Sequence, residues 1–376
     1  MRLALDCRYV RERPSGIGAY VQALVDRLPA LAPAARFDLW VDPRARRPIS
    51  RAPNVSEHVV NAPANGLFTL LCPTRLADFA DVDALHAPFN ILGRGVPCPT
   101  VVTIHDLMWI TAPALAEGFS PITPLKAGFY RDGIVRALRR ASRLIAISNA
   151  TADAIRRLCP DATERVRVIP HGVEARFRPV TDQELLRASL RARFGIRRPY
   201  FLVVGQNTPS KNHAAIVDGF AVAGASLDCE LVLLQRLYQN SRLAKRARKL
   251  RVAERVRSLP SASPDDVVAL LQGAAALIQF SRFEGFGLPA LEAMACGTPV
   301  IASDVPALIE VLGGAALHVP LRTEALASAL LRVAQSETLR SELSARGLER
   351  SRGYSWDRSA ELHLEVYREA AEAKRS

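Results

Sequence analysis

Short apolar runs alternate with longer stretches of helical periodicity along the whole chain. In the first half, the apolar runs that predict buried strands cover residues 3–7, 37–41, 84–86, 100–104, 144–147 and 166–169. In the second half they cover residues 200–205, 230–234, 275–280, 299–302 and 316–319. Strands that alternate with helices in this way form parallel sheets with helices on both faces. The pattern therefore predicts an α/β protein with two doubly wound domains.

A polar stretch that contains a proline separates the two halves. It covers residues 176–181, and we place the boundary between domains 1–178 and 179–355 inside it. A chain of 376 residues is too long for one ordinary core. Its apolar content of 49 % is sufficient for two buried sheets. Because ligand sites favour domain interfaces, we expect the active site in a cleft between the domains.

The N-terminus and the cysteines indicate the compartment. The chain has no apolar run of about eighteen residues, the length that a membrane span needs. Asp6 interrupts the apolar N-terminal run, which argues against a signal peptide. The six cysteines include no Cys-x-x-Cys pair, and this favours reduced thiols over a zinc site. We therefore expect a cytoplasmic, soluble protein.

The net charge of +13 raises the question of an anionic partner. Five arginines gather on a predicted helix at positions 131, 136, 139, 140 and 143, and a second basic run extends from Arg236 to Arg257. One interpretation is two solvated helix faces. The other is peripheral contact with the anionic inner face of the cytoplasmic membrane, where each basic residue contributes about 1 kcal/mol. No nucleic-acid-binding motif is present, so nucleic acid is not an expected partner.

Residues 283–300 form the most informative segment. A predicted strand ends there in a turn that contains Gly285, Phe286 and Gly287, and a helix begins at Leu288. Backbone N–H groups and the helix dipole favour an anion at such a turn, and a diphosphate suits it. Glu284 and Glu292 lie on either side of the turn. The first can contact a sugar ring and the second a ribose diol, although an isolated glutamate at such a place only caps a helix.

This segment resembles the Glu-x7-Glu signature of the retaining glycosyltransferases of family 4. The resemblance implies the GT-B fold, with two Rossmann-like domains that face each other across a cleft. It also implies that Glu284 contacts the hydroxyls of the donor sugar, that Glu292 binds the ribose, and that the backbone of residues 285–288 receives the distal phosphate. Donors of this family are nucleoside diphosphate sugars, and neither a metal nor another cofactor is expected. Asp81-Val82-Asp83, which spells a metal-binding motif of another fold, is interpreted as chance.

The end of the chain carries a second part of the resemblance. Tyr354-Ser355-Trp356-Asp357 is similar to the closing motif of the family, and a helical pattern follows it. In GT-B enzymes this helix crosses back to the first domain. We therefore expect residues 356–376 to return to the N-terminal domain.

A glycine pair follows the first predicted strand. Gly16 and Gly18 open a helix, but the third glycine of a dinucleotide-binding fingerprint would fall at Val21. This disfavours a dinucleotide-dependent oxidoreductase. The resemblance implies a loop that closes over donor and acceptor, and a structural tight turn is the alternative.

Two histidines end neighbouring strands of the first domain. His105 follows the strand at residues 100–104, and side chains at the carboxyl ends of parallel strands point into the ligand crevice. The resemblance makes His105 the residue that contacts the donor sugar and supports charge on the leaving group. A core histidine paired with Asp106 is the alternative. His86 ends the preceding strand and is a candidate for the acceptor side.

The loop after residue 204 offers a cation. Gly205 begins this loop, and Lys211 near its end can place a positive charge against a diphosphate at the following helix. Lysine is rare in this arginine-rich chain, which makes Lys211 less easily explained by composition. The family usually has an arginine in this loop as well, and Gln206 and Ser210 stand there instead. Arg282 is a possible substitute.

Together these features predict a retaining hexosyltransferase. We expect it to move a hexose from a nucleoside diphosphate sugar, with GDP-mannose as the guess, to a glycan or lipid-linked acceptor. The pathway implied by the resemblance is the biosynthesis of surface polysaccharide, such as O antigen, or of lipopolysaccharide. Lys211, the turn at residues 285–287 and His105 would stabilise the leaving diphosphate. A nucleic-acid-binding protein and a dinucleotide-dependent oxidoreductase are the alternatives.

Overall fold

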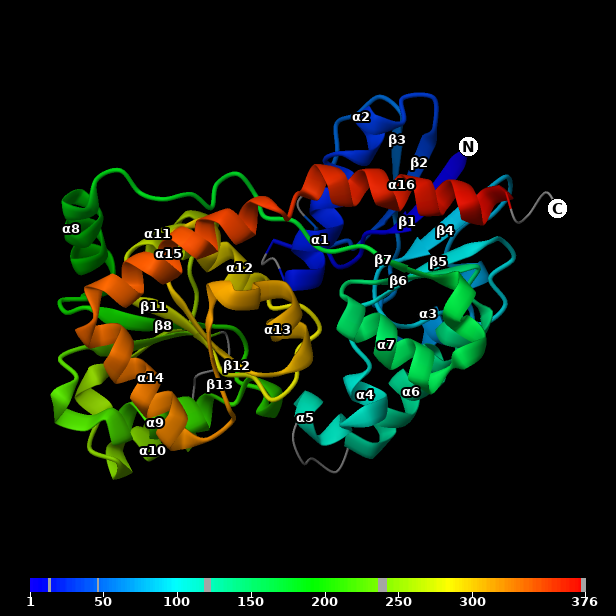
Figure 1. The fold of residues 1–376 in the computed structure, drawn as a ribbon. Coiled ribbons are helices and arrows are strands. Elements are labelled where there is room, and N and C mark those ends of the chain that lie inside the picture. Colours follow the sequence, from blue (N-terminus) through cyan, green and yellow to red (C-terminus); the bar gives the residue numbers. More distant parts are fainter. Residues whose placement is uncertain (13–14, 46, 118–122, 236–241, 373–376) are drawn as a thin grey trace. The chain divides into compact units, whose positions relative to one another are not determined.

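The computed structural model describes residues 1–12, 15–45, 47–117, 123–235 and 242–372, and it divides into two compact units (Figure 1). Unit 1 consists of Met1–Pro113, Ser120–Gly172 and Ser355–Ser376. Unit 2 consists of Ala114–Phe119 and Val173–Tyr354. The main division therefore follows Gly172, and the predicted boundary at residue 178 lies inside unit 2.

Unit 1 contains a parallel sheet of seven described strands in the order β3-β2-β1-β4-β5-β6-β7. The order reverses at β1, because β2 pairs with one side of β1 and β4 with the other. The strands are β1 (Arg2–Asp6), β2 (Arg36–Val41), β3 (Val55–Val59), β4 (Ala84–Ala87), β5 (Thr100–Ile104), β6 (Arg143–Ala146) and β7 (Val166–Val168).

Helices cover this sheet and enclose its core. Apolar side chains of β1, β2, α1 and α16 make up one large buried cluster. The helices of unit 1 are α1 (Gly16–Val25), α2 (Leu28–Leu31), α3 (Leu67–Leu71), α4 (Met108–Thr111), α6 (Thr123–Arg140), α7 (Asn149–Leu158) and α16 (Trp356–Glu372). The short helix α5 (Pro113–Glu117) belongs almost entirely to unit 2. Two 3₁₀ turns lie at Pro73–Arg75 and Pro160–Arg165.

A buried polar network fixes α16 to the rest of unit 1. The Tyr367 hydroxyl lies 2.8 Å from His86 Nδ1, and the Tyr20 hydroxyl lies 2.7 Å from His363 Nε2. His363 Nδ1 donates to the Ser359 carbonyl at 2.7 Å. His363 Nε2 therefore accepts, because a neutral imidazole carries one proton. Polar groups in a core are stable only when they are paired, so this network specifies where α16 binds.

Unit 2 contains a second parallel sheet, of six described strands in the order β10-β9-β8-β11-β12-β13. Here the order reverses at β8, which pairs with β9 and β11. In open α/β sheets, ligands bind beyond the carboxyl ends of the strands at such a reversal. The strands are β8 (Tyr200–Val204), β9 (Glu230–Leu234), β10 (Val256–Leu259), β11 (Ala276–Gln279), β12 (Val300–Ser303) and β13 (Leu317–Val319).

The helices of unit 2 pack on both faces of its sheet. Apolar residues of β8, β9, α9 and α14 form its largest core cluster. The helices are α8 (Gln183–Phe194), α9 (His213–Ala223), α10 (Arg242–Lys249), α11 (Pro264–Gln272), α12 (Leu288–Ala295), α13 (Pro306–Leu312), α14 (Thr323–Gln335) and α15 (Glu337–Arg352). Short 3₁₀ turns lie at Pro209–Lys211, Gly224–Ser226, Ala253–Arg255 and Gly313–Ala315.

Two strands were not predicted, and both lie at the edge of a sheet. β3 has the sequence VSEHV and β10 has the sequence VRSL, and neither contains a fully buried residue. Each packs against one neighbouring strand only and leaves its side chains partly exposed, so its sequence lacks the apolar run that marks a central strand. The pattern of apolar positions consequently identified the interior strands and the more apolar edge strands β7 and β13, and missed these two.

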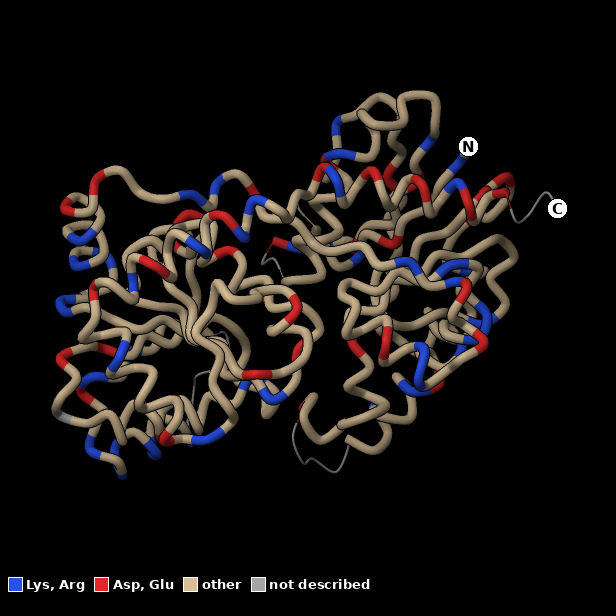
Figure 2. The backbone as a smooth tube through the Cα atoms, in the orientation of Figure 1, with Lys and Arg blue, Asp and Glu red and all other residues tan. Residues whose placement is uncertain are grey.

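The basic clusters are less helical than predicted. Arg143 begins β6 and donates to Glu369 at 2.7 Å, so it does not belong to the basic face of α6. In the second cluster, α10 holds the cations from Arg242 to Lys249, and Arg257 lies on β10. Arg236 lies outside the described residues. Figure 2 shows the lysines and arginines of α10 along one stretch of backbone.

No helix among the described residues is long and apolar enough to span a membrane. All six cysteines are free thiols. In the part of the chain that the structure describes, no group of histidines, cysteines and carboxylates has the arrangement of a metal site.

Candidate functional site

A turn between β11 and α12 builds the centre of the candidate site. Gly287 is the N-cap of α12 and has a φ of 96°, where a residue with a side chain would be strained. A Cβ atom there would also collide with Leu308. Phe286 is buried and packs edge-on against Tyr354, with ring centroids 5.7 Å apart. Glycine and phenylalanine thus fix the turn at the carboxyl edge of the sheet and start α12 there.

Glu284 is held at the mouth of this turn by three donors on one oxygen. Its Oε1 accepts from Lys211 Nζ at 2.5 Å and from Ser281 Oγ at 2.7 Å. Gln279 Nε2 donates to the same oxygen. No described group hydrogen-bonds to Oε2. The carboxylate is therefore immobilised through one oxygen, and the other is left to meet a ligand.

Lys211 reaches Glu284 from the loop that follows β8. Asn212 adopts the left-handed conformation, with a φ of 57°, and α9 begins at the next residue. Gly205 at the start of the loop has a φ of 139° and donates to the Leu234 carbonyl at 3.1 Å. The fold thereby brings together Lys211 and Glu284, two residues that the sequence analysis singled out separately.

Residues that replace the expected arginine of this loop do not supply a cation. Ser210 is buried, and its hydroxyl lies 2.9 Å from that of Thr208. The Arg282 backbone N–H donates to the Ser210 carbonyl at 2.7 Å. This bond ties the Arg282 loop to the Lys211 loop, and the exposed Arg282 remains the candidate for the second cation.

Glu292 differs from Glu284 because no described group donates a hydrogen bond to its carboxylate. Burial raises its pKa to about 8; the negative charge of Glu174 adds to the rise and the positive charge of Arg176 opposes it. The side chain is half-buried, so its carboxylate is partly removed from water without a compensating protein donor, which costs free energy in the unliganded protein. Two hydroxyl donors, as in a ribose diol, would satisfy it.

Sequence reasoning missed Gln279 and Ser281. Both are buried, and the Ser303 hydroxyl in turn donates to the Ser281 carbonyl at 2.6 Å. The available signal was a polar glutamine at the end of the apolar run of β11, because an unpaired amide has no place in a core. The side-chain amide of Gln279 donates to Glu284 Oε1 and so holds this carboxylate in place.

In unit 1, the structure favours a structural role for Gly18. Ser15 caps α1, and its hydroxyl accepts from the Gly18 N–H at 3.1 Å. A Cβ atom on Gly18 would collide with the Tyr9 carbonyl. Space is open around Gly16, so packing does not require a glycine there. The preceding Pro14 lies outside the described residues.

His105 is a neutral acceptor at the carboxyl end of β5. Its Nε2 lies 2.8 Å from the Pro88 carbonyl, which can only accept, so the proton resides on Nε2 and Nδ1 carries a lone pair. Burial lowers the pKa of His105 to about 4. A neutral ring in this tautomer accepts a hydrogen bond from a hydroxyl and gives no positive charge to a phosphate. The His105 ring pairs with the Pro88 carbonyl and not with Asp106, the partner expected of a core histidine. Asp106 Oδ1 accepts from the Met108 N–H.

The prediction that His86 lines the acceptor side is wrong. His86 is 2 % exposed, and both ring nitrogens have partners, Thr103 at 2.8 Å and Tyr367 at 2.8 Å. It is part of the network that binds α16. Position at a strand end did not reveal this, because the partner helix is distant in sequence.

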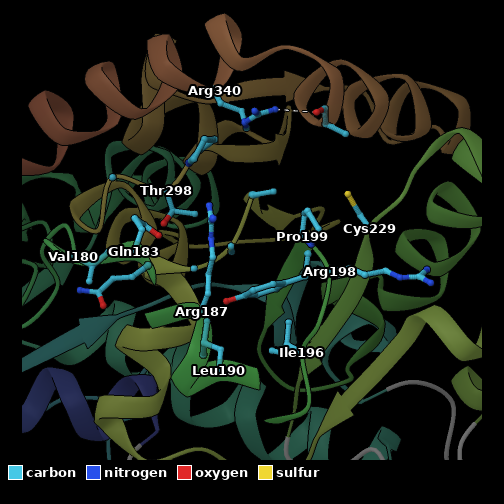
Figure 3. Close-up of a pocket in the computed structure, with 18 of the residues that line it drawn as sticks. Val180, Gln183, Arg187, Leu190, Ile196, Arg198, Pro199, Cys229, Thr298 and Arg340 are labelled. Carbon is cyan, nitrogen blue, oxygen red and sulfur yellow. Dashed lines mark hydrogen bonds between the residues drawn. The ribbon is translucent and has the colours of Figure 1, made fainter. Parts of the chain in front are cut away.

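A cavity of about 1160 Å³ lies elsewhere in unit 2 (Figure 3). Its walls include Tyr200, Cys229, Thr298 and Arg187. These residues precede or begin strands, or belong to α8, so the cavity opens at the amino ends of the strands. The candidate site lies at their carboxyl ends, and the two regions are separate.

Comparison with solved structures defines the class of fold. Sucrose-phosphate synthase from Thermosynechococcus elongatus aligns with a TM-score of 0.76 and 22 % identity over 99 % of this chain and 100 % of that one. HepE of Anabaena, in complex with UDP and glucose, aligns with a TM-score of 0.70 and 18 % identity over 97 % and 98 % of the two chains. The two Rossmann-like units are those of the GT-B fold.

Comparison of sequences gives the family. Residues 14–177 match the model described as Glycosyltransferase Family 4, and residues 187–350 match Glycosyl transferases group 1. D-inositol 3-phosphate glycosyltransferase from Actinosynnema mirum is 30 % identical over 91 % of this chain and 90 % of its own length. The chain belongs to glycosyltransferase family 4, and it is an enzyme that transfers glycosyl groups.

Proposed function

We propose that this enzyme transfers a hexose, with retention of configuration, from a nucleoside diphosphate sugar to a hydroxyl group. The observation that supports this most directly is the pair of carboxylates at the carboxyl edge of unit 2. Glu284 is fixed by Lys211 with one oxygen unused, and Glu292 is a half-buried carboxylate with no donor among the described residues. Sugar hydroxyls and a ribose diol are donors that match these two acceptors.

The donor would lie along the loops of unit 2. Its diphosphate would contact Lys211 and the N-terminal turn of α12, where the charge and the helix dipole favour an anion. Glu284 Oε2 would accept from a sugar hydroxyl, and Glu292 would accept from the ribose. His105 would accept from a further sugar hydroxyl through Nδ1, which revises its predicted support of leaving-group charge.

In the reaction, the bond between the sugar C1 and the phosphate oxygen breaks as the acceptor oxygen bonds to C1 from the same face. The proton of the acceptor hydroxyl passes to the leaving phosphate, so no protein nucleophile is needed. Lys211 would stabilise the charge that develops on that phosphate. Fixing Glu284 through three donors orients the sugar before the reaction, which lowers the entropic part of the barrier.

The substrates are proposed from resemblance. Mannose is the proposed sugar, with GDP-mannose as donor. The acceptor is proposed to be a glycan or a lipid-linked glycan of surface polysaccharide, made on the inner face of the cytoplasmic membrane. The similar Actinosynnema mirum enzyme is named for D-inositol 3-phosphate, so that polyol phosphate belongs among the acceptors to be tested.

Ligand-dependent unfolding tests the proposal without knowledge of the acceptor. Wild type and Glu292→Ala would be unfolded thermally with UDP, GDP, ADP and dTDP and with their sugars. A ligand at about 100 times its Kd adds about 2.7 kcal/mol to the free energy of unfolding. We expect one base to stabilise wild type and Glu292→Ala to lose most of that response.

Glu349→Ala is the matched control, because Glu349 is an exposed glutamate of α15 whose partner is Arg352. It should respond to nucleotides as wild type does. If no nucleotide stabilises folded wild type, the proposed donor class is wrong. If Glu292→Ala responds fully, the ribose role of Glu292 is wrong.

A further inference from the structure

Gln235 is a buried amide at the carboxyl end of β9. It is 2 % exposed, and its Oε1 lies 3.1 Å from Nδ1 of His213, the first residue of α9. His213 is also 2 % exposed. Two polar side chains are thus enclosed where β9 ends and α9 begins.

The protonation of this pair follows from its chemistry. An amide oxygen only accepts, so His213 Nδ1 carries the ring proton and donates it. Burial lowers the pKa of His213 to about 4, and the positive charge of Lys211 acts in the same direction. The imidazole is neutral, and its bond to Gln235 fixes the orientation of the amide.

The other end of the amide is unsatisfied. Gln235 Nε2 is buried and has no hydrogen-bond partner among the residues that the structure describes. Native proteins pair almost all such groups, so an orphan donor calls for a ligand or another explanation. The two N–H bonds of this nitrogen are suited to an acceptor such as a phosphate oxygen.

The position of Gln235 indicates which acceptor its Nε2 group is placed to meet. β9 pairs with β8, and the Leu234 carbonyl accepts from Gly205, the first residue of the Lys211 loop. His213, which holds the amide, is two residues after Lys211 in the chain. The orphan donor therefore lies beside the N-terminus of α9, where a cation, a helix dipole and a glycine loop favour an anion.

We propose that the Gln235 amide donates a hydrogen bond to the diphosphate of the donor and is a specificity-determining residue of this enzyme. This inference rests on the proposed function, because it needs a nucleoside diphosphate sugar as donor. The ligand removes the cost of a buried donor that the free protein carries. Gln235 would therefore discriminate in favour of ligands that present a phosphate at this place.

Two substitutions at Gln235 test the proposal. Gln235→Leu removes both polar groups, and Gln235→Glu keeps an oxygen for His213 while it replaces the donor with an anionic acceptor. Gln272→Leu is the matched control: Gln272 donates to the Arg178 carbonyl and ends α11 just before β11, so it lies at the amino ends of the strands, away from the candidate site. The probes are UDP, GDP, ADP and dTDP, each with its nucleoside, with Kd measured by calorimetry.

We expect Gln235→Leu to weaken binding of the preferred nucleoside diphosphate about tenfold or more, as for a lost hydrogen bond to a charged group. Binding of the matching nucleoside should not change. Gln235→Glu should weaken binding of the diphosphate further, because the carboxylate repels the phosphate charge. Without ligand, Gln235→Leu exchanges the unsatisfied Nε2 donor for a His213 Nδ1–H that has lost its acceptor, so its unfolding temperature should stay close to that of wild type.

Other results would overturn the inference. Equal losses for nucleoside and diphosphate would assign Gln235 a structural role, and unchanged diphosphate binding would remove any role. If Gln235→Leu does not fold, Gln235→Glu decides alone, since it retains the acceptor for His213. If wild type binds none of the four diphosphates, the proposed function fails together with this inference, whereas binding without an effect of Gln235 contradicts this inference only.

Discussion

At the scale of single residues, the two glutamates of the signature are built differently. Three donors reach Oε1 of Glu284, whereas no group in the described part of the chain donates to the carboxylate of Glu292. The pKa of Glu292, raised to about 8 from the ordinary 4.5, expresses that cost. Binding sites often retain such unfavourable groups, because a ligand satisfies them.

The raised pKa of Glu292 predicts how stability depends on pH. The folded state favours the protonated carboxyl of Glu292. Its contribution to the free energy of unfolding is therefore fully present below pH 4.5 and is lost as the pH rises to about 8. Glu292→Gln should therefore equal wild type near pH 4 and be more stable above it. The gain should grow by at most about 1.4 kcal/mol per pH unit and level off above pH 8.

Denaturant unfolding of both proteins from pH 4 to pH 9 measures this difference. Glu349→Gln, an exposed substitution of the same kind, should follow wild type throughout. A Glu292→Gln protein that is less stable at pH 8 would show that the carboxylate is well solvated or paired, contrary to this interpretation.

At the scale of elements, the histidines that bind α16 predict sensitivity to acid. Burial lowers the pKa of His86 well below its usual range and that of His363 to about 4. Histidines with depressed pKa values stabilise the fold above about pH 6.5, and this contribution is lost as the pH falls toward 4. We expect unit 1 to lose stability steeply in that window.

The substitution His86→Gln together with His363→Gln should reduce this dependence. The double variant should be less stable than wild type at pH 7, because it disrupts the buried network, but its stability should fall less between pH 6.5 and pH 4. Thermal unfolding at steps of half a pH unit measures both slopes. Parallel slopes for the two proteins would show that the acid sensitivity arises elsewhere.

The basic helix α10 allows the membrane alternative to be tested. Its cations Arg242, Lys245, Arg248 and Lys249 are exposed, while Arg246 pairs with Asp218. If the proposed membrane contact involves α10, replacing these four by glutamine should abolish binding to vesicles of anionic lipid. At low salt the variant should lose about 1 kcal/mol of binding free energy per replaced residue. At high salt the difference in binding between the variant and wild type should vanish.

Vesicle co-sedimentation measures this binding. The control replaces four exposed arginines of the same unit, at positions 187, 191, 197 and 198, by glutamine. Equal binding of both variants and wild type would leave α10 as a solvated face. Salt-dependent binding to duplex DNA rather than vesicles would favour the nucleic-acid alternative.

At the scale of the whole molecule, the two parallel sheets and the family agree with the sequence prediction. Interior strands such as β5 and β9 coincide with the predicted residues 100–104 and 230–234. Their apolar runs determine them locally, because a central strand of a parallel sheet is buried on both faces. The edge strands β3 and β10 have no such local mark, and only pairing with a neighbour makes them strands.

The candidate site divides in the same way. The sequence alone determined the turn at residues 285–288 and its two glutamates, since the strand, the glycines and the start of the helix are consecutive in the chain. Tertiary structure decided that Lys211 pairs with Glu284, that His86 belongs to the anchor of α16, and that Gln235 Nε2 meets no acceptor in the described part of the chain. These facts depend on residues far apart in sequence that the fold brings into contact. A local pattern contains no information about such partners, and hydrogen bonding and burial are set by partners.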